Sequence, residues 1–276
     1  MRNKISMGTL ARSGLLLLWS VILIIPLMLL LFGAVKSSSA FMMDPYSWPD
    51  KLVLTNFSDA WNQADLARAL LNSVLVTGCS ILSLAVLGSA GAYPLARRAS
   101  KLSSILYIFF ISGIMLPFQL AMIPLYKLMG GLHLTNTYFG AIMIYVASTL
   151  PFVIFLYTGF LKSVPRELEE AATIDGCGPI RTFVSIIFPL LKPVTATVVI
   201  TNSLNIWNDF LVPLLFLQEK ASRTIPMAIF TFVGQYNNNW SLIFASIAIS
   251  SLPLILLFLL LQKYFIKGIA GGAVKG

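Results

Sequence analysis

The distribution of apolar residues constrains the fold of this chain more than any other feature of its sequence. Six apolar runs are each long enough to cross the hydrocarbon core of a bilayer, which takes roughly 20 helical residues. Because lipid offers no partners to free backbone groups, each run is expected to be helical. We therefore predict an all-α integral membrane protein in which residues 1–276 form a single transmembrane domain. The runs lie near residues 14–35, 70–94, 103–126, 137–161, 191–217 and 241–266.

The composition agrees with a membrane location and argues against other classes. Of the 276 residues, 58% are hydrophobic and only 11% are charged, whereas soluble domains carry about 25% charged residues. The net charge of +9 does not indicate nucleic-acid binding, because the basic residues stand at the ends of apolar runs and not on one face of a soluble domain. Cys79 and Cys177 form neither a disulfide framework nor a zinc motif.

The first apolar run has two interpretations. Basic residues before it (Arg2, Lys4 and Arg12) and the small residues SSSA (37–40) after it resemble a secretory signal peptide. Its 22 apolar positions exceed the roughly 7–15 residues of a typical signal-peptide core. We therefore expect the run to be retained as the first span.

Basic residues are unevenly distributed between the two sides of the predicted membrane. With six spans both termini lie on one side, which carries thirteen basic residues against six on the other. Because cytoplasmic loops carry the excess of Lys and Arg, both termini are predicted to be cytoplasmic. The thirteen are Arg2, Lys4, Arg12, Arg97, Arg98, Lys101, Lys162, Arg166, Arg181, Lys192, Lys263, Lys267 and Lys275, and the six are Lys36, Lys51, Arg68, Lys127, Lys220 and Arg223.

Two predicted outside segments, 36–69 and 218–240, are longer than simple connectors. Within the first, residues 56–73 are compatible with an amphipathic helix lying at the interface and leading into the second span. A loop with aromatic anchors explains the same residues equally well. The second segment has an apolar middle, PMAIFTF (226–232), followed by NNNW (237–240).

One cytoplasmic stretch, 163–190, interrupts the apolar pattern with two short helical signals. Ser163 and Pro165 suit a helix start, and the acids Glu167, Glu169 and Glu170 would lie near the positive end of its dipole. Gly176 is suited to close that helix in the left-handed conformation. Pro179 can start a second helix whose apolar residues recur at helical spacing (Ile180, Phe183, Val184 and Ile187). Physical reasoning alone is also satisfied by an ordinary surface loop with a solvated acidic face.

This stretch resembles the EAA motif of ABC-importer permeases. The motif has Glu-Ala-Ala, three residues, Gly, nine residues and then Ile-x-Leu-Pro. Here Glu170-Ala171-Ala172, Gly176, Ile186 and Pro189 keep that spacing, with Phe188 in the place of the leucine. The longer form SVPRELEEAATIDG (163–176) is similar to the carbohydrate, or maltose-type, branch. Further similarities lie in AYPLARR (92–98), LPFQLAMIPLY (116–126), WNDFLVP (207–213) and GIAGGAVKG (268–276).

The resemblance implies a subunit of a larger assembly. In such permeases the EAA loop forms coupling helices that dock into a cleft on a cytoplasmic ATPase. Glu170 would face basic groups of the ATPase, Ala171 and Ala172 would allow close approach, and Gly176 would form the bend. The full set of implied coupling residues is Glu169, Glu170, Ala171, Ala172, Asp175, Gly176, Ile186 and Pro189. The chain has no phosphate-binding loop of the G-x-x-x-x-G-K-[ST] type, so ATP and Mg are expected on the partner ATPases and no cofactor on this chain.

Polar residues inside the predicted spans suggest a substrate path. Asn202, Asn205 and Asp209 recur at helical spacing in the fifth span, and polar groups are costly when they face lipid. Neutral polar groups beside aromatic rings suit a sugar, although polar residues also hold membrane helices together. The candidate path residues are Tyr145, Ser148, Thr149, Asn202, Asn205, Trp207, Asn208 and Asp209, of which residues 207–209 match a family motif.

Catalytic and proton-coupled functions find little support in the sequence. Asp209 is the only acid within a predicted span, and a proton relay generally needs more groups. His133 is the lone histidine and has no cysteine near it, so neither a metal site nor a nucleophile–base pair is indicated.

We therefore expect a transport subunit, not an enzyme, in a bacterial-type plasma (inner) membrane. Its predicted partners are a second permease chain in a hetero-dimer, two cytoplasmic ATPase subunits, an extracytoplasmic sugar-binding protein and membrane lipid. Resemblance to maltose-type permeases implies contact with the binding protein through Gln235, Tyr236, Asn237 and Asn238, and a tail at 272–276 that reaches between the ATPases. The alternatives are an ABC importer for a non-sugar solute and an ion- or proton-coupled transporter that acts alone.

Overall fold

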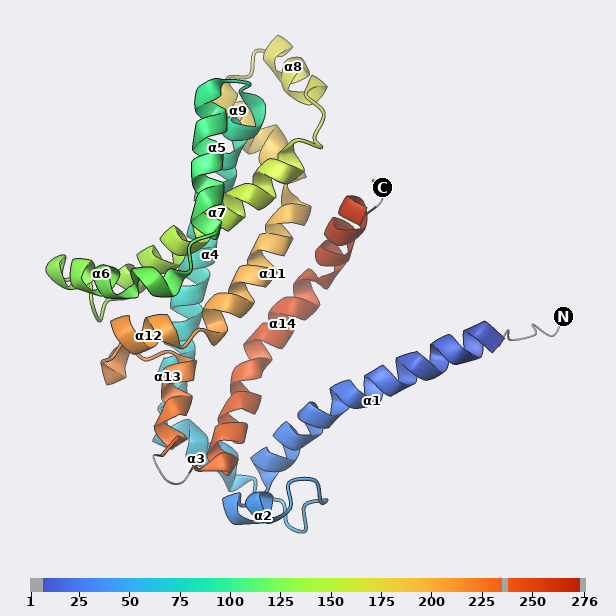
Figure 1. Ribbon diagram of the computed structural model, residues 1–276, viewed down its shortest axis with the longest axis vertical. Coiled ribbons are helices and arrows are strands. Elements are labelled where there is room, and N and C mark those ends of the chain that lie inside the picture. The colour runs from blue at the N-terminus through green and yellow to red at the C-terminus, as the bar shows by residue number, and fades with distance from the viewer. Residues whose placement is uncertain (1–6, 235–237, 274–276) are drawn as a thin grey trace. The chain divides into compact units, whose positions relative to one another are not determined.

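The computed structural model describes residues 7–234 and 238–273, and every regular element in them is helical (Figure 1). They form two compact units, one from 1–67 and 228–252 and the other from 68–227 and 253–276. The prediction of an all-helical membrane protein is confirmed, and Gln235, Tyr236 and Asn237 lie outside the described residues.

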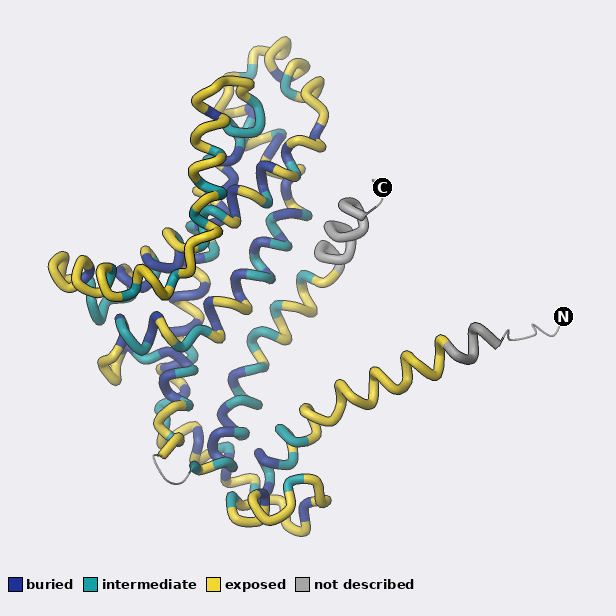
Figure 2. Tube along the Cα trace, in the orientation of Figure 1, coloured by how far each residue is buried: buried dark blue, intermediate teal, exposed yellow. Residues whose placement is uncertain are grey.

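The first unit contains α1 (Met7–Val35), α2 (Ser38–Met43), α3 (Thr55–Gln63), η3 (Phe230–Phe232) and the start of α14 (Trp240–Ala273). Apolar side chains on α1 are exposed along most of its described length (Figure 2), as expected for a helix surrounded by lipid. The loop after α1 is organised by Lys36, which is only 3% exposed. Its ammonium group donates to the backbone oxygens of Asp44 and Ser47 and to the Ser47 hydroxyl.

The second unit is built around α7 (Tyr138–Leu161), which packs against α5 (Lys101–Ile114), α11 (Lys192–Asn208) and α12 (Leu211–Phe216). Most of α4 (Leu66–Arg97) also belongs to it. The core side chains Val153, Tyr157 and Leu161 of α7 are fully buried. The remaining elements are α6 (Phe118–Gly131), α8 (Glu167–Ile174), α9 (Pro179–Thr182), η1 (Phe183–Ile187), α10 (Phe188–Leu190), η2 (Lys220–Ser222) and α13 (Ile225–Ile229), which runs on into the first unit.

By length and composition, four described helices could each cross a membrane: α1, α4, α7 and α14. Two bent helix pairs raise the number to six if each pair is one span. One pair, α5 and α6, bends by 97°, and the other, Pro179–Leu190 with α11, bends by 70°. The first, second, fourth and sixth apolar runs therefore correspond to long helices and the third to a bent pair, whereas the second bent pair begins at Pro179, before the fifth run at 191–217.

Two apolar runs expected to be continuous helices are divided in the structure, and so is the segment 56–73, for which the sequence allows both a helix and a loop. The third run breaks between Ile114 and Phe118, where Pro117 supplies no backbone N–H to continue the helix. The fifth run breaks at Asp209 and Phe210. The segment 56–73 is two helices, because Asp65 adopts a positive φ of 50° between α3 and α4.

Candidate functional site

The stretch 163–190 does form two short helices joined by a glycine turn. After α8, Gly176 has φ +76°, its N–H donates to Thr173 O, and the N–H of Cys177 donates to Ala172 O. These two bonds are the Schellman arrangement that satisfies the last carbonyls of a helix. The predicted start was wrong, because α8 begins at Glu167 and the Ser163 hydroxyl donates to Phe160 O instead of capping it.

The second helix differs from the expected amphipathic pattern. Pro179 stands at its first turn as predicted, but the helix continues as a π-helix over residues 183–187. A π-turn adds a residue and rotates the face that follows. Ile187 is fully buried, whereas Ile180 is 79% exposed and Val184 is also exposed. The predicted stripe is therefore divided between the core and the surface.

Acidic residues in the first turn of α8 have different environments. Glu169 is half-buried, and its carboxylate accepts from Arg97 Nε at 2.6 Å and from the Tyr93 hydroxyl at 2.8 Å. Glu170 is exposed. The same Arg97 donates to the backbone oxygens of Leu161 and Val164. Glu169 thus attaches α8 to α4, and Glu170 remains accessible.

The exposed surface of the loop combines this acid with apolar side chains. Ile174, at the end of α8, is 86% exposed. A shallow hollow of about 570 Å³ lies over the second helix and is lined by Gly178, Pro179, Ile180, Arg181, Val184 and Ser185. Of the other predicted coupling residues, Ala171, Asp175, Gly176 and Pro189 are exposed, Ile186 is half-buried and Ala172 is buried. An exposed acid on a surface that also exposes Ile174, Ile180 and Val184 suits a protein partner better than solvent.

The predicted polar stripe of the fifth span is not one helical face. Asn202 is fully buried, and its amide nitrogen donates to Val198 O in its own helix. Asn205 and Asn208 are exposed on α11. Asp209 lies beyond the helix end with extended backbone angles, so the helical spacing does not continue to it. Trp207 is buried, whereas Ser148 is exposed and Thr149 is half-buried on α7.

Asp209 connects three elements at the break in the fifth run. Its carboxylate accepts from the backbone N–H groups of Leu211 and Val212, which open α12. It also accepts from the Tyr145 hydroxyl of α7 at 2.9 Å. A carboxylate that receives first-turn N–H groups acts as a helix cap. The break is therefore stabilised by specific hydrogen bonds, and these hold α12 against α7.

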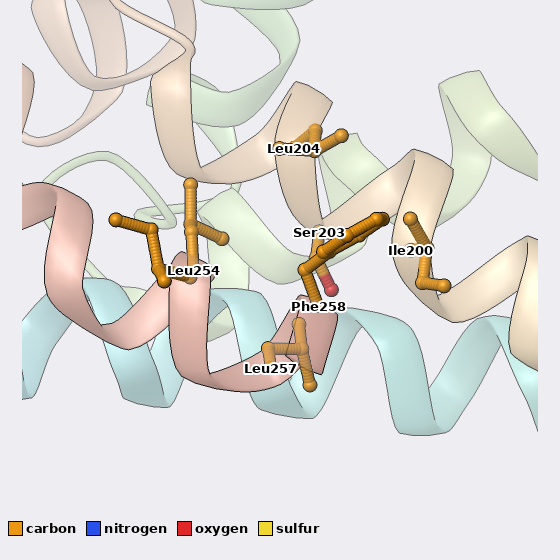
Figure 3. A pocket seen from close by; sticks show the side chains of 7 residues that line it. Ile200, Ser203, Leu204, Leu254, Leu257 and Phe258 are labelled. Carbon is orange, nitrogen blue, oxygen red and sulfur yellow. The ribbon is translucent and has the colours of Figure 1, made fainter. Parts of the chain in front are cut away.

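An apolar groove with a cavity volume of about 220 Å³ runs between α11 and α14 in the second unit (Figure 3). Its lining includes Ile200, Ser203 and Leu204 from α11 and Leu254 and Phe258 from α14. Ser203 is the single polar lining residue, and its buried hydroxyl has no hydrogen-bond partner within the described chain. Sequence reasoning missed this groove, because its two walls lie far apart in the sequence.

Two further predicted features are the outside segment 218–240, whose contact residues are described only at Asn238, and the lone histidine, His133. Asn238 is described, and its side-chain oxygen accepts from Gly234 N within the first unit. His133 lies in a turn with φ 55°. No group of three or more potential metal ligands occurs among the residues that the structure describes.

Comparison with known proteins places these features in a family. Residues 84–271 match the family described as "Binding-protein-dependent transport system inner membrane component". The chain is 41% identical over 253 residues to the melibiose/raffinose/stachyose import permease protein MelC of Bacillus subtilis (strain 168), covering 91% of each chain. It is 37% identical over 257 residues to the probable starch degradation products transport system permease protein AmyC of Thermoanaerobacterium thermosulfurigenes, covering 93% of each.

Its fold is similar to that of a chain in the crystal structure of a bacterial ABC transporter involved in the import of the acidic polysaccharide alginate. The TM-score is 0.82, and the match covers 96% of this chain and 99% of the other at 18% sequence identity. This likeness supports the helical architecture.

Proposed function

This chain belongs to the family of binding-protein-dependent transport system inner membrane components, and from that membership we propose that it forms the path for a neutral oligosaccharide in an ATP-driven importer. As a family member it is a multi-pass permease component of an ABC system and not itself an enzyme, and no cofactor is expected on it. Relatives named for melibiose, raffinose and stachyose and for starch degradation products support the substrate class.

The character of the path residues supports a neutral sugar over an acidic one. Within α7 and α11 the exposed or half-buried path residues Ser148, Thr149, Asn205 and Asn208 are all uncharged. In the same two described helices the single basic residue is Lys192, at the first position of α11. An acidic polysaccharide would need cationic partners along its path. Hydroxyl and amide groups instead match the hydroxyls of a neutral sugar.

We propose a six-span topology in one transmembrane domain, with both termini in the cytoplasm. It counts the bent pair α5 and α6 as one span and the broken fifth run, α11 with α12, as another, and it leaves Pro179–Leu190 in the loop 163–190. Arg97 contacts Leu161 and Val164, so the end of α4 and the end of α7 lie together. That common end carries Arg97, Lys162 and Arg166, and basic residues concentrate on the cytoplasmic side.

On that side, the loop 163–190 is the proposed docking element for a cytoplasmic ATPase. Glu170 supplies the charge, and Ile174, Ile180 and Val184 supply apolar contact area. ATP binding would close two ATPase subunits and carry the docked loop with them. A second permease chain completes the path, and a sugar-binding protein delivers the substrate on the opposite side through a surface that includes Asn238.

Uptake by the complete importer tests this function. The chain is purified with its ATPase and second permease chain and reconstituted in proteoliposomes with the binding protein. Import of labelled melibiose, raffinose and stachyose is measured, with an alginate oligosaccharide as the acidic comparison. We expect ATP-dependent import of at least one neutral sugar, abolished when the Walker lysine of the ATPase is replaced. Import of the alginate fragment alone, or import without ATP, would refute the proposal.

A further inference from the structure

The end of α4 holds the coupling loop by two side chains one helical turn apart. Arg97 binds Glu169 of α8, the carbonyl of Leu161 at the end of α7 and the carbonyl of Val164 just beyond it. Tyr93 donates to the same carboxylate, and its ring packs on Phe183 with centroids 5.1 Å apart. Both halves of the loop and the end of α7 are therefore attached to α4. We refer to Tyr93, Arg97 and Glu169 as the inner clamp.

Between their ends, α4 and α7 approach each other at small residues. A methyl group added at Gly88 would overlap Cγ1 of Val153, and one at Gly91 would contact Ile154 at 3.7 Å. Glycine at such positions lets two membrane helices approach closely, and packing then drives their association. At this contact α4 and α7 are packed so closely that they cannot slide past each other unless the α7 side chains rearrange.

The opposite ends of the same two helices hold an outside segment. The amide nitrogen of Asn72, near the start of α4, donates to the backbone oxygens of Ala221 and Arg223 at 2.9 and 2.8 Å. Its oxygen accepts from the Tyr138 hydroxyl, at the start of α7, at 2.8 Å. All three hydrogen bonds of this side chain join separate parts of the second unit. We refer to Asn72 and Tyr138 as the outer clamp.

We propose that Arg97 is a positioning residue that makes α8, the α4–α7 pair and the segment 220–225 move as one body. The inner and outer clamps lie about 37 Å apart along α4, at about 1.5 Å per residue. Motion imposed on α8 would then reach the outside segment directly. This inference rests on the proposed function, because the ATPase and the binding protein are what act on the two ends.

Distance measurements between spin labels test the mechanical claim and need no substrate. Labels are placed at Glu167→Cys in α8 and Lys220→Cys, both exposed positions, with Cys79 and Cys177 replaced by serine. In the assembled importer we expect one narrow distance that is unchanged between the nucleotide-free and ATP-bound states. Arg97→Gln should broaden it, and Arg98→Gln, the same change at the exposed neighbour, should not. A wild-type distance that shifts with ATP, or no effect of Arg97→Gln, would overturn the proposal.

The second measurement is of energy coupling, that is, of the number of ATP molecules hydrolysed for each sugar molecule imported. Arg97→Gln and Asn72→Ala should each raise the ATP hydrolysed per sugar imported by at least about fivefold, the lower end of typical coupling effects, while the ATPase still copurifies. Arg97→Lys, which can keep the ion pair but not the paired carbonyl bonds, should lie between. Asn62→Ala, an exposed amide on α3, is the control for Asn72.

The two failures are distinguishable. If the wild-type complex imports none of the tested sugars with ATP, the proposed function is contradicted. The spin-label distances would still show whether the two clamps hold these segments together as one body. A working wild type whose ATP-to-sugar ratio is unchanged in Arg97→Gln and Asn72→Ala contradicts the clamp alone.

Discussion

The hydroxyl of Tyr145 in α7 donates a hydrogen bond across 2.9 Å to Asp209, at the break between α11 and α12. This contact explains why an acidic residue occurs in the fifth apolar run without invoking proton transfer, because the same carboxylate also caps α12. A structural role and a proton-relay role make different demands on the charge, so substitutions at Asp209 separate them.

Asp209→Asn is therefore expected to retain substantial ATP-driven uptake with little change in its pH dependence. Asparagine is as good a helix cap as aspartate, and its side-chain oxygen can still accept from Tyr145 and from Val212 N–H, which share one oxygen of Asp209. Asp209→Ala should be worse, because loss of a cap costs about 1 kcal/mol. Proteoliposome uptake at acidic, neutral and alkaline pH checks both variants. Abolished uptake in Asp209→Asn, together with uptake by the wild type on a proton gradient without ATP, would refute the structural interpretation.

Gly176 and Gly178 form a matched pair for testing the turn in the coupling loop. A side chain would meet open space at either position, but only Gly176 has a positive φ. A non-glycine residue in that conformation costs about 1–2 kcal/mol. Gly176→Ala should reduce ATPase copurification and uptake, whereas Gly178→Ala, which adds only a methyl group, should be close to wild type and Gly176→Asn intermediate. Equal behaviour of the two alanine variants would show that the left-handed turn is not required.

How far the sequence predicts this loop depends on the range of the interactions. Local rules predicted the left-handed glycine and the proline at the second helix, because both depend on a few neighbouring residues. The exposure of Ile180 and Val184 was not predictable from periodicity, since the π-helix over 183–187 changes the register.

Long-range contacts were harder still to anticipate. The pairing of Arg97 with Glu169 joins residues 72 positions apart, and AYPLARR (92–98) carried only a family resemblance. The stripe through Asp209 was predicted from helical spacing, which does not apply once α11 ends at Asn208. The predicted residues at 235–237 lie outside the described chain and stay predictions.

Charge reversal at Glu170 tests the docking surface. Glu170 is exposed, whereas its neighbour Glu169 is held by Arg97. Glu170→Lys should place like charges against basic groups of the ATPase and cause loss of copurification. Glu167→Lys, also exposed in the first turn of α8, makes the same change to the charge near the helix dipole and is the control. Similar losses in both variants would assign the effect to helix stability instead of docking.

Accessibility labelling tests the orientation of the chain, which follows from the excess of basic residues on the proposed cytoplasmic side. Met43 is 87% exposed in the proposed outside loop, and Ile174 is 86% exposed in the coupling loop. Single cysteines are placed at these positions with Cys79 and Cys177 replaced by serine, in cells that lack the partner ATPase, so that docking does not cover Ile174→Cys. In intact cells stripped of any outer membrane, an impermeant thiol reagent should label Met43→Cys and leave Ile174→Cys unlabelled until the cells are permeabilised. Labelling of Ile174→Cys from outside would reverse the proposed topology and remove the coupling loop from the ATPase side.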